Sequence, residues 1–356
     1  QDGIRIFSSA NIIGGTNAAA RNVISGNGGD GIEFNGVDAT LNQTYGNFIG
    51  TDASGILNRG NSANGLLIST SARSNYLGAA LPGAGNIIAY NSGDGISIVA
   101  ANAHTNNPCR GNAIYLNGDL GIDLAANGVS ANDAGDADVG ANQMQNFPVL
   151  TPASHTPTEV LIGGTLNGRA STTFVLDFYA NAQRDPTGSG EGQYYLGATN
   201  VTTDGAGNTS FTVSLPSANF KGRFVSATAT DPFGNTSEFA TNLTAVSTVA
   251  AATFTVINTN DTGVGSLRQA LLDANANIAS GPDTIAFNIP GSGVQTNRPA
   301  SALPVITDAV IIDGYTQPGT ATNTSATAFN GTLLIRLDGT QAGSAVATVL
   351  SGGTEF

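Results

Sequence analysis

The 356-residue sequence has no tryptophan, one cysteine, one methionine and two histidines. Because Cys109 stands alone, no disulfide can form within the chain, and stability has to come from strand pairing and apolar packing. The sequence around this thiol is typical of a partly buried loop residue. His104 and His155 lie in loop-like sequence without metal-ligand spacing or a serine nucleophile motif, which argues against the common histidine-based sites.

Charge is also scarce, and most of it is negative. Charged residues make up 10% of the chain, with 12 Lys and Arg against 25 Asp and Glu, for a net charge of −13. Nucleic acid is therefore excluded as a partner, because phosphate binding needs basic stripes. No apolar run approaches the roughly 18 residues of a membrane span. The sequence begins inside a repeat without a signal peptide, which indicates that processing removed such a segment or that the sequence is part of a longer polypeptide. This composition is typical of an extracellular or cell-surface protein.

A glycine followed by an aliphatic residue recurs through the first third of the chain. These glycines, at positions 3, 31, 65, 95 and 121, are 26 to 34 residues apart. Such spacing indicates a solenoid with about three short strands per turn, whose loops vary in length while its strands do not. Alternation along each strand directs the middle aliphatic residue inward, onto its counterpart in the next coil. The predicted core ladder consists of Ile4, Ile32, Leu66, Ile96 and Ile122.

A second signature places asparagine before another apolar strand of each repeat. Asparagine accepts the left-handed backbone angles of a corner and can hydrogen-bond the coil above or below. Equivalent residues about 4.8 Å apart would satisfy one another along the axis. The predicted asparagine ladder consists of Asn22, Asn47, Asn86 and Asn112. We expect coils over residues 1–126.

The stretch from residue 127 to 147 is rich in Asp, Asn and Gly. Oxygen side chains at near-alternate positions around glycines suit a hard cation, although the spacing is not that of an EF-hand. The tentative Ca²⁺ ligands are Asp133, Asp136, Asp138 and Asn142. The alternative is a solvated turn linker without a cation.

Longer alternating strands follow over residues 148–246. They are predicted near residues 160–162, 173–179, 194–201, 209–215 and 223–230, with turn clusters between them. Short alternating strands at this turn spacing indicate an antiparallel sandwich. Without tryptophan or a cysteine pair, it would be Ig-like in architecture only.

The last part, residues 253–356, contains the one convincing helix. Ser266 and Gln269 predict a capping box, and Leu267 and Leu271 belong to an apolar stripe at helical spacing. A short amphipathic helix beside a solenoid suggests an end cap, because an uncovered coil exposes apolar rungs and strand edges. Strands are then expected at residues 284–287, 309–314 and 333–339.

The residues from Gly265 to Ala270 resemble the CSLREA-type motif that begins parallel β-helix domains in large bacterial surface proteins, with Gly265 where the cysteine usually stands. The repeats from Asn22 to Asn27 and from Asn47 to Asp52 are similar to the right-handed, pectin-lyase-like β-helices of that group. Residues 227–239 are similar to its Ig-like modules. The resemblance implies an all-β protein that combines a right-handed parallel β-helix, an Ig-like antiparallel sandwich and a short capping helix. The resemblance implies little about catalytic activity or ligand binding, because a fold alone does not assign a function.

The resemblance raises the hypothesis of a polysaccharide lyase or hydrolase. Such enzymes need a base beside acidic residues, or carboxylates paired at roughly 5 to 9.5 Å. The outward acids do not recur as a cluster with the arginines, and turn formation explains most of them better. We therefore expect no catalytic residues. The acids considered are Glu33, Asp38, Asp52, Asp119 and Asp123.

The order of the parts suggests a structural function. In the group that the chain resembles, the capping segment precedes the coils, whereas here it follows them. We expect residues 253–356 of one copy to stack on the Gly3 coil of the next, in a filament, stalk or adhesin built from separate copies or tandem repeats. The alternative is fold-back within one chain, giving a self-capped surface module that binds a glycan through Tyr194, Tyr195 or Phe233.

Overall fold

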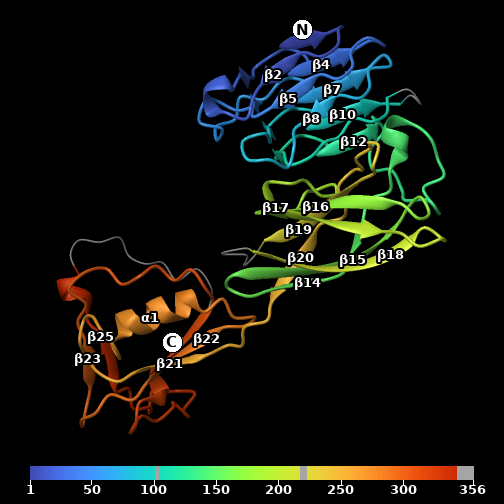
Figure 1. The fold of residues 1–356 in the computed structure, drawn as a ribbon. Coiled ribbons are helices and arrows are strands. Elements are labelled where there is room, and N and C mark those ends of the chain that lie inside the picture. The colour runs from blue at the N-terminus through green and yellow to red at the C-terminus, as the bar shows by residue number, and fades with distance from the viewer. Residues whose placement is uncertain (101–103, 217–222, 343–356) are drawn as a thin grey trace. The chain divides into compact units, whose positions relative to one another are not determined.

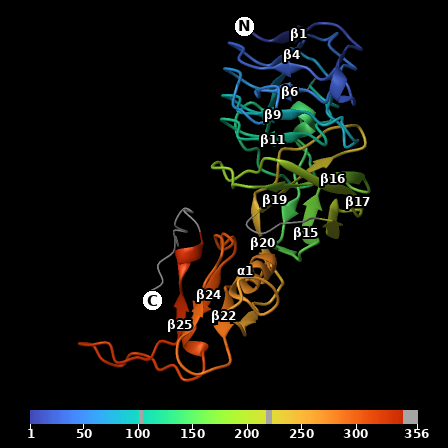
Figure 2. The ribbon, with the colours of Figure 1, turned by 90° about the vertical axis from the view of Figure 1, so that its left-hand side faces the viewer.

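The computed structural model describes residues 1–100, 104–216 and 223–342, and these residues form predominantly β-structure with one α-helix. The chain divides into two compact units, Gln1–Val246 and Ser247–Phe356. Figures 1 and 2 show the strands of both units. Among the described residues, no helix has both the length and the apolar character that crossing a membrane requires.

Three parallel sheets make up the first part of the N-terminal unit, which we call the coil stack (Figure 1). The first sheet contains β1 (Ile4–Ile6), β4 (Ile32–Asn35), β7 (Leu66–Ser69), β10 (Ile96–Val99) and β12 (Ile122–Ala125). The second contains β3 (Val23–Ile24), β6 (Phe48–Ile49), β9 (Ile87–Ala89) and β11 (Ala113–Tyr115). The third contains β2 (Ile12–Gly14), β5 (Gln43–Tyr45) and β8 (Tyr76–Leu77). In every sheet, strands from successive repeats are neighbours.

The register of the first sheet follows the glycine repeat. Ile4 pairs with Ile32, Ile32 with Leu66, Leu66 with Ile96, and Ile96 with Ile122. The four later members of this column are at most 1% exposed, whereas Ile4 is partly exposed. Since burying one such side chain is worth about 1.5–3 kcal/mol, the repeated aliphatic residue is a main source of stability.

The second part of the N-terminal unit is antiparallel. It contains β13 (Val149–Leu150), β14 (Ala153–His155), β15 (Glu159–Asn167), β16 (Thr173–Asn181), β17 (Tyr194–Thr202), β18 (Asn208–Pro216), β19 (Phe224–Thr230) and β20 (Leu243–Ser247). β15 pairs with β13, β14 and β18, and β16 pairs with β17 and β19. We use the name sandwich for strands β13 to β20 only as a label for this antiparallel part. Strands β15 to β19 lie where the alternating pattern predicts them, whereas β13, β14 and β20 were not predicted.

Strand β16 is buried on both faces. Phe174, Leu176 and Phe178 belong to the apolar core of the sandwich. Tyr179 belongs instead to the core of the coil stack, together with Phe239. The sandwich therefore packs directly on the coils through this strand.

The C-terminal unit starts a second parallel stack. β21 (Thr253–Val256), β22 (Asp283–Phe287) and β24 (Val310–Asp313) form one sheet, and β23 (Gln295–Asn297) pairs with β25 (Ile335–Leu337). Helix α1 (Leu267–Ala276) contacts β21 and β22. Its buried residues are the predicted stripe, Leu267, Ala270, Leu271 and Ala274.

The capping of α1 differs in part from the prediction. Ser266 is the N-cap, and its hydroxyl accepts a hydrogen bond from the Gln269 backbone N–H at 3.2 Å. The Gln269 side chain does not complete the box, because it donates to Asp273 at 2.8 Å. The Ser266 N–H instead donates to the carbonyl of Gly263. In a complete capping box the Gln269 side chain would accept a hydrogen bond from the Ser266 N–H. That N–H is already bonded within the local turn.

Candidate functional site

Three ladders of asparagine side chains run along the coil stack. In each ladder, the backbone N–H and the side-chain amide of one residue donate to the Oδ1 atom of its counterpart in the next coil. Asn47, for example, donates from its backbone and from Nδ2 to Oδ1 of Asn86, at 3.0 and 3.2 Å. The ladders are Asn11–Asn42–Asn75–Asn107–Asn142, Asn22–Asn47–Asn86–Asn112 and Asn27–Asn61–Asn91–Asn117.

The sequence pattern alone indicated only one of these ladders. The other two ladders use asparagines that look like ordinary turn residues in the sequence. Their matched position in every repeat is the sequence feature that could have identified them. Four of the ladder residues are completely buried: Asn42, Asn61, Asn75 and Asn107. Burying an amide is strongly unfavourable unless its polar atoms are hydrogen-bonded, and the ladder supplies these hydrogen bonds.

A fourth ladder runs in the opposite direction. The backbone N–H of Asp30 donates to Asp2, that of Asn64 to Asp30, and that of Asp94 to Asn64, at 2.9 to 3.0 Å. Asp94 in turn accepts from the N–H of Leu120. Burial, reinforced by the charge of Asp123, raises the pKa of Asp94 to about 6. These Asp–Gly turns therefore contribute hydrogen bonds between coils as well as turn geometry.

The sandwich seals the last coil through two buried glutamates. Glu191 accepts hydrogen bonds from the backbone N–H groups of Leu116 and Asn117, at 2.6 and 3.1 Å. Glu238 accepts from the N–H groups of Leu124 and Ser130, at 3.0 and 2.9 Å. Burial raises the pKa of each glutamate to about 7. Each carboxylate occupies the place where a further coil would supply acceptors.

Backbone pairing and an ion pair complete this seal. Ile114 and Gly192 exchange two backbone hydrogen bonds of 2.8 Å. Arg110 makes two bonds to the fully buried carboxylate of Asp177, at 2.6 and 2.9 Å. Such a planar two-bond pair holds both groups in a defined orientation. The sandwich is thus joined rigidly to the last coil.

The opposite end of the coil stack has no such cover among the described residues. β1, β2 and β3 are the terminal strands of their sheets, and we call them together the first-coil edge. Among the described residues, no donor reaches Oδ1 of Asn11, Asn22 or Asn27, although the equivalent atoms of later coils all accept hydrogen bonds. This edge therefore presents free strand groups and three side-chain acceptors.

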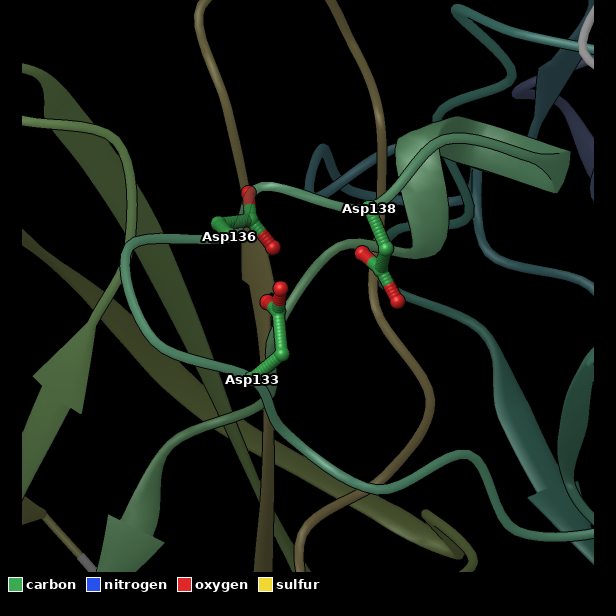
Figure 3. Close-up of side chains that lie close together, drawn as sticks. All are labelled: Asp133, Asp136 and Asp138. Atoms are coloured by element: carbon green, nitrogen blue, oxygen red, sulfur yellow. The ribbon is translucent and has the colours of Figure 1, made fainter.

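Three carboxylates gather in the loop between the last coil and the sandwich. Asp133, Asp136 and Asp138 each place one oxygen within 4.8 Å of the others (Figure 3). Burial raises the pKa of Asp136 to about 6, with further contributions from the two neighbouring carboxylates. A cavity of about 80 Å³ lies beside them and is also lined by Gln145 and Arg169. These oxygens would suit a divalent cation.

Asn142 is not part of this cluster, contrary to the expected Ca²⁺ set. Its Oδ1 accepts from the N–H of Asn107 at 3.0 Å, and its Nδ2 donates to the carbonyls of Asn107 and Thr236. It is the final member of an asparagine ladder and is completely buried. Its amide is committed to the coil, because the loop folds back to supply the last ladder position.

The acids and arginines of the coils are arranged differently from the expectation. Arg5, Glu33 and Asp123 do lie in one row of the first sheet, where Arg5 pairs with Glu33. Leu67 and Ser97 separate Glu33 from Asp123, so three strand spacings of about 4.8 Å lie between the two carboxyl groups. That separation is larger than the distance at which two carboxyl groups share one glycosidic bond.

The remaining candidate side chains have local structural contacts. Cys109 is buried, which raises the pKa of its thiol. His104 lies between Val99 and Ser71 and hydrogen-bonds the backbone of both. The Tyr195 hydroxyl donates to Asp177, whereas Tyr194 and Phe233 are 43% and 61% exposed.

Comparison with known proteins does not place the chain in a family. No family model matches the sequence, and no curated protein matches it.

Proposed function

We propose that this protein is a structural module of an extracellular filament, stalk or adhesin, and that its activity is end-to-end association of coils. In this proposal the coil stack is a right-handed parallel β-helix and the sandwich is an Ig-like module of a bacterial surface protein. One observation carries the proposal: successive coils pair through the same parallel strands and asparagine acceptors, so a coil of another molecule could pair with the first coil in the same way.

The difference between the two ends is chemical as well as geometric. At the last coil, Glu191, Glu238 and Gly192 supply acceptors and strand pairing. At the first coil, β1, β2 and β3 are the terminal strands of three separate sheets, and each has a strand neighbour on one side only among the described residues. An unprotected strand edge is an association surface, because its N–H and C=O groups pair readily with another strand.

The low charge and the absence of lysine near this edge favour the same function. In proteins that remain monomeric, exposed edge strands are often protected from pairing by charged residues, lysine above all, or by proline. The only charged side chain on β1 is Arg5, and it pairs with Asp2 and Glu33. Strand addition would therefore meet no unpaired charge on this strand.

A divalent cation is a second element of the proposal. Asp133, Asp136 and Asp138 would hold Ca²⁺ in the loop that joins the last coil to the sandwich. A cation there would neutralise three clustered carboxylates and stabilise the loop. Binding at this loop would support the module without taking part in association.

Electron microscopy and analytical ultracentrifugation of the purified chain test the main proposal. Rods with a regular axial repeat, and a sedimentation coefficient that rises with concentration, are expected. A chain that stays monomeric at high concentration by both methods would contradict it. Assays with polygalacturonate and alginate, in which unsaturated products would indicate a lyase instead, provide the functional control.

A further inference from the structure

The loop after the last coil contains the pair Asn127–Gly128, whose surroundings differ from those of the other Asn–Gly pairs in the described part of the chain. We infer that this pair modifies itself: the Gly128 nitrogen attacks the side-chain amide carbon of Asn127, and the Asp123 carboxylate accepts the proton that this nitrogen loses. The product is a cyclic imide, which water converts to aspartate or isoaspartate. This inference goes beyond the proposed function and does not depend on it.

The sequence by itself does not single out this pair. Ring closure is easiest where glycine follows asparagine, because glycine has no Cβ to obstruct the attacking nitrogen. Seven such pairs occur in the chain, and they begin at Asn27, Asn35, Asn64, Asn117, Asn127, Asn167 and Asn330. Only the fold can therefore make one of them more reactive than the others.

The first difference is the freedom of the asparagine side chain. Asn127 is exposed, and its side-chain amide has no hydrogen-bond partner among the described residues. The amide of Asn117, by contrast, bonds the carbonyl of Ile88 and the carboxylate of Glu191. A free amide can turn its carbon toward the next backbone nitrogen, whereas a bonded amide resists this rotation. Hydrogen bonds also hold the amides of Asn27, Asn35, Asn64, Asn167 and Asn330.

The second difference is the acceptor of the glycine N–H. Gly128 donates to Oδ2 of Asp123 at 2.9 Å. A carboxylate can remove a proton as a general base, and a backbone carbonyl cannot. Asp123 is 5% exposed, and burial raises the pKa of its carboxyl group, which makes the carboxylate a stronger base. In four other pairs the glycine N–H donates to a backbone carbonyl: Gly36, Gly65, Gly118 and Gly168.

Hydrogen bonds hold the loop around this carboxylate. The N–H groups of Leu124 and Ser130, on either side of the pair, both donate to Glu238, at 3.0 and 2.9 Å. Asn127 donates its own backbone N–H to Oδ1 of Asp123 at 3.2 Å. The base and the attacking nitrogen are thus held together before the reaction, which is the arrangement that accelerates an intramolecular step.

The backbone just before the pair is strained. Ala125 and Ala126 have φ angles of 81° and 55°, in the left-handed region that residues with a Cβ rarely adopt. Isoaspartate routes the chain through the side-chain carbon and so lengthens the backbone of this tight turn. The reaction can therefore release strain that a relaxed loop would not hold.

The reaction needs only these three residues and water. As the bond forms between the Gly128 nitrogen and the amide carbon of Asn127, the N–H proton passes to Asp123. The same carboxyl group then returns the proton to the amide nitrogen, the bond between that nitrogen and the carbon breaks, and ammonia leaves. Water from the solvent opens the imide at one of its two carbonyl groups, which gives aspartate or isoaspartate.

Peptide mass spectrometry of the intact chain after incubation at neutral pH tests the inference. Trypsin should release residues 111–169 as one peptide, because Arg110 and Arg169 flank a stretch without Lys or Arg. This peptide contains the pairs at Asn117, Asn127 and Asn167, so two internal controls accompany the site. Fragment ions locate the mass increase that follows loss of ammonia and addition of water.

Asp123→Asn is the decisive variant, because it keeps an oxygen acceptor and removes the base. In the folded wild type, Asn127 should convert at least about tenfold faster than Asn117 and Asn167, and Asp123→Asn should slow its conversion by about tenfold or more. In denaturant the three pairs should convert at similar rates, and Asp123→Asn should have no effect. Asn127→Gln should abolish the signal at this position, because its longer side chain closes the ring far less readily.

Circular dichroism establishes that Asp123→Asn is folded. Equal conversion of the three pairs in the folded wild type would overturn the inference, as would a folded Asp123→Asn variant that converts Asn127 at the wild-type rate. If the variant does not fold, the comparison of the three pairs within the wild-type chain decides.

Discussion

Glu191 replaces an asparagine at the end of a ladder. Its Oε1 atom accepts the backbone N–H of Asn117 at 3.1 Å and the side-chain amide of the same residue at 3.2 Å. These are the two bonds that each inner asparagine makes to the Oδ1 of its successor. A glutamate 74 residues away in the sequence thus terminates the repeat.

Replacing this glutamate should weaken the seal in proportion to the acceptors lost. Glu191→Ala leaves the N–H groups of Leu116 and Asn117 without an acceptor, at a cost of about 1–3 kcal/mol for each buried donor. Glu191→Gln keeps one acceptor oxygen and should cost less. Urea unfolding of the two variants measures the difference, and equal losses would contradict the role of the acceptor.

Stability should rise as the pH falls from about 8 to about 5. Glu191 and Glu238 have a folded-state pKa of about 7, above the ordinary value of 4.5, because burial penalises their charged forms. The folded chain therefore binds protons more tightly than the unfolded chain. The resulting stability is complete below pH 4.5 and is lost as the pH rises through 7.

Thermal unfolding across this pH range measures the effect. The Glu191→Gln, Glu238→Gln double variant should show a flatter profile, since neither position can titrate. Asp94 and Asp136, whose pKa values are raised to about 6, leave a smaller slope in the same direction. A double variant with the wild-type slope would refute the assignment to the two glutamates.

Asparagines inside a ladder should matter more than those at its open end. Asn86 accepts two hydrogen bonds from Asn47 and donates to Asn112 and to the carbonyl of Thr44. Asn22 donates to Asn47 and accepts no hydrogen bond from the described residues. Asn86→Ala should therefore lower the free energy of unfolding by about 2–5 kcal/mol, and Asn22→Ala by about 1 kcal/mol or less.

These two variants form a matched pair, because both remove the same side chain from the same ladder. Chemical denaturation gives both values. If Asn22→Ala proved as costly as Asn86→Ala, the ladder would not be the reason for the cost.

Calcium should raise the melting temperature if the three clustered aspartates hold it. Asp136→Asn removes one oxygen charge from the cluster and should abolish most of the shift, and EDTA should reverse it. Asp119→Asn, at an exposed aspartate outside the cluster, is the control. Thermal unfolding with and without Ca²⁺ checks the prediction, and a wild type that does not respond would refute it.

The cap of α1 offers a test within the C-terminal unit. Ser266→Ala removes the acceptor for the Gln269 N–H and should destabilise this unit by about 0.5–2 kcal/mol. Gln269→Ala should cost only a few tenths of a kcal/mol, because that side chain bonds Asp273 on the helix surface. Thermal unfolding distinguishes the two variants, and the reverse order would indicate a full capping box.

Much of the fold was predictable because it is periodic. The glycine repeat and the aliphatic residue after it define Ile32, Leu66 and Ile96 as equivalent positions, and parallel stacking then brings them together. The cap helix was equally local, since its stripe and its N-cap lie within one short segment. The clustering of Asp133, Asp136 and Asp138 also follows from nearness in the sequence.

The ends of the stack were decided only by the tertiary structure. A repeat specifies what each coil does to its neighbour, and it carries no information about the residue that replaces a neighbour after the last coil. Glu191, Glu238 and Asn142 reach their positions through loops and strands outside the period. Sequence alone thus determined the repeating core of this protein, whereas long-range packing decided which end is sealed, because buried donors there must find acceptors wherever the chain supplies them.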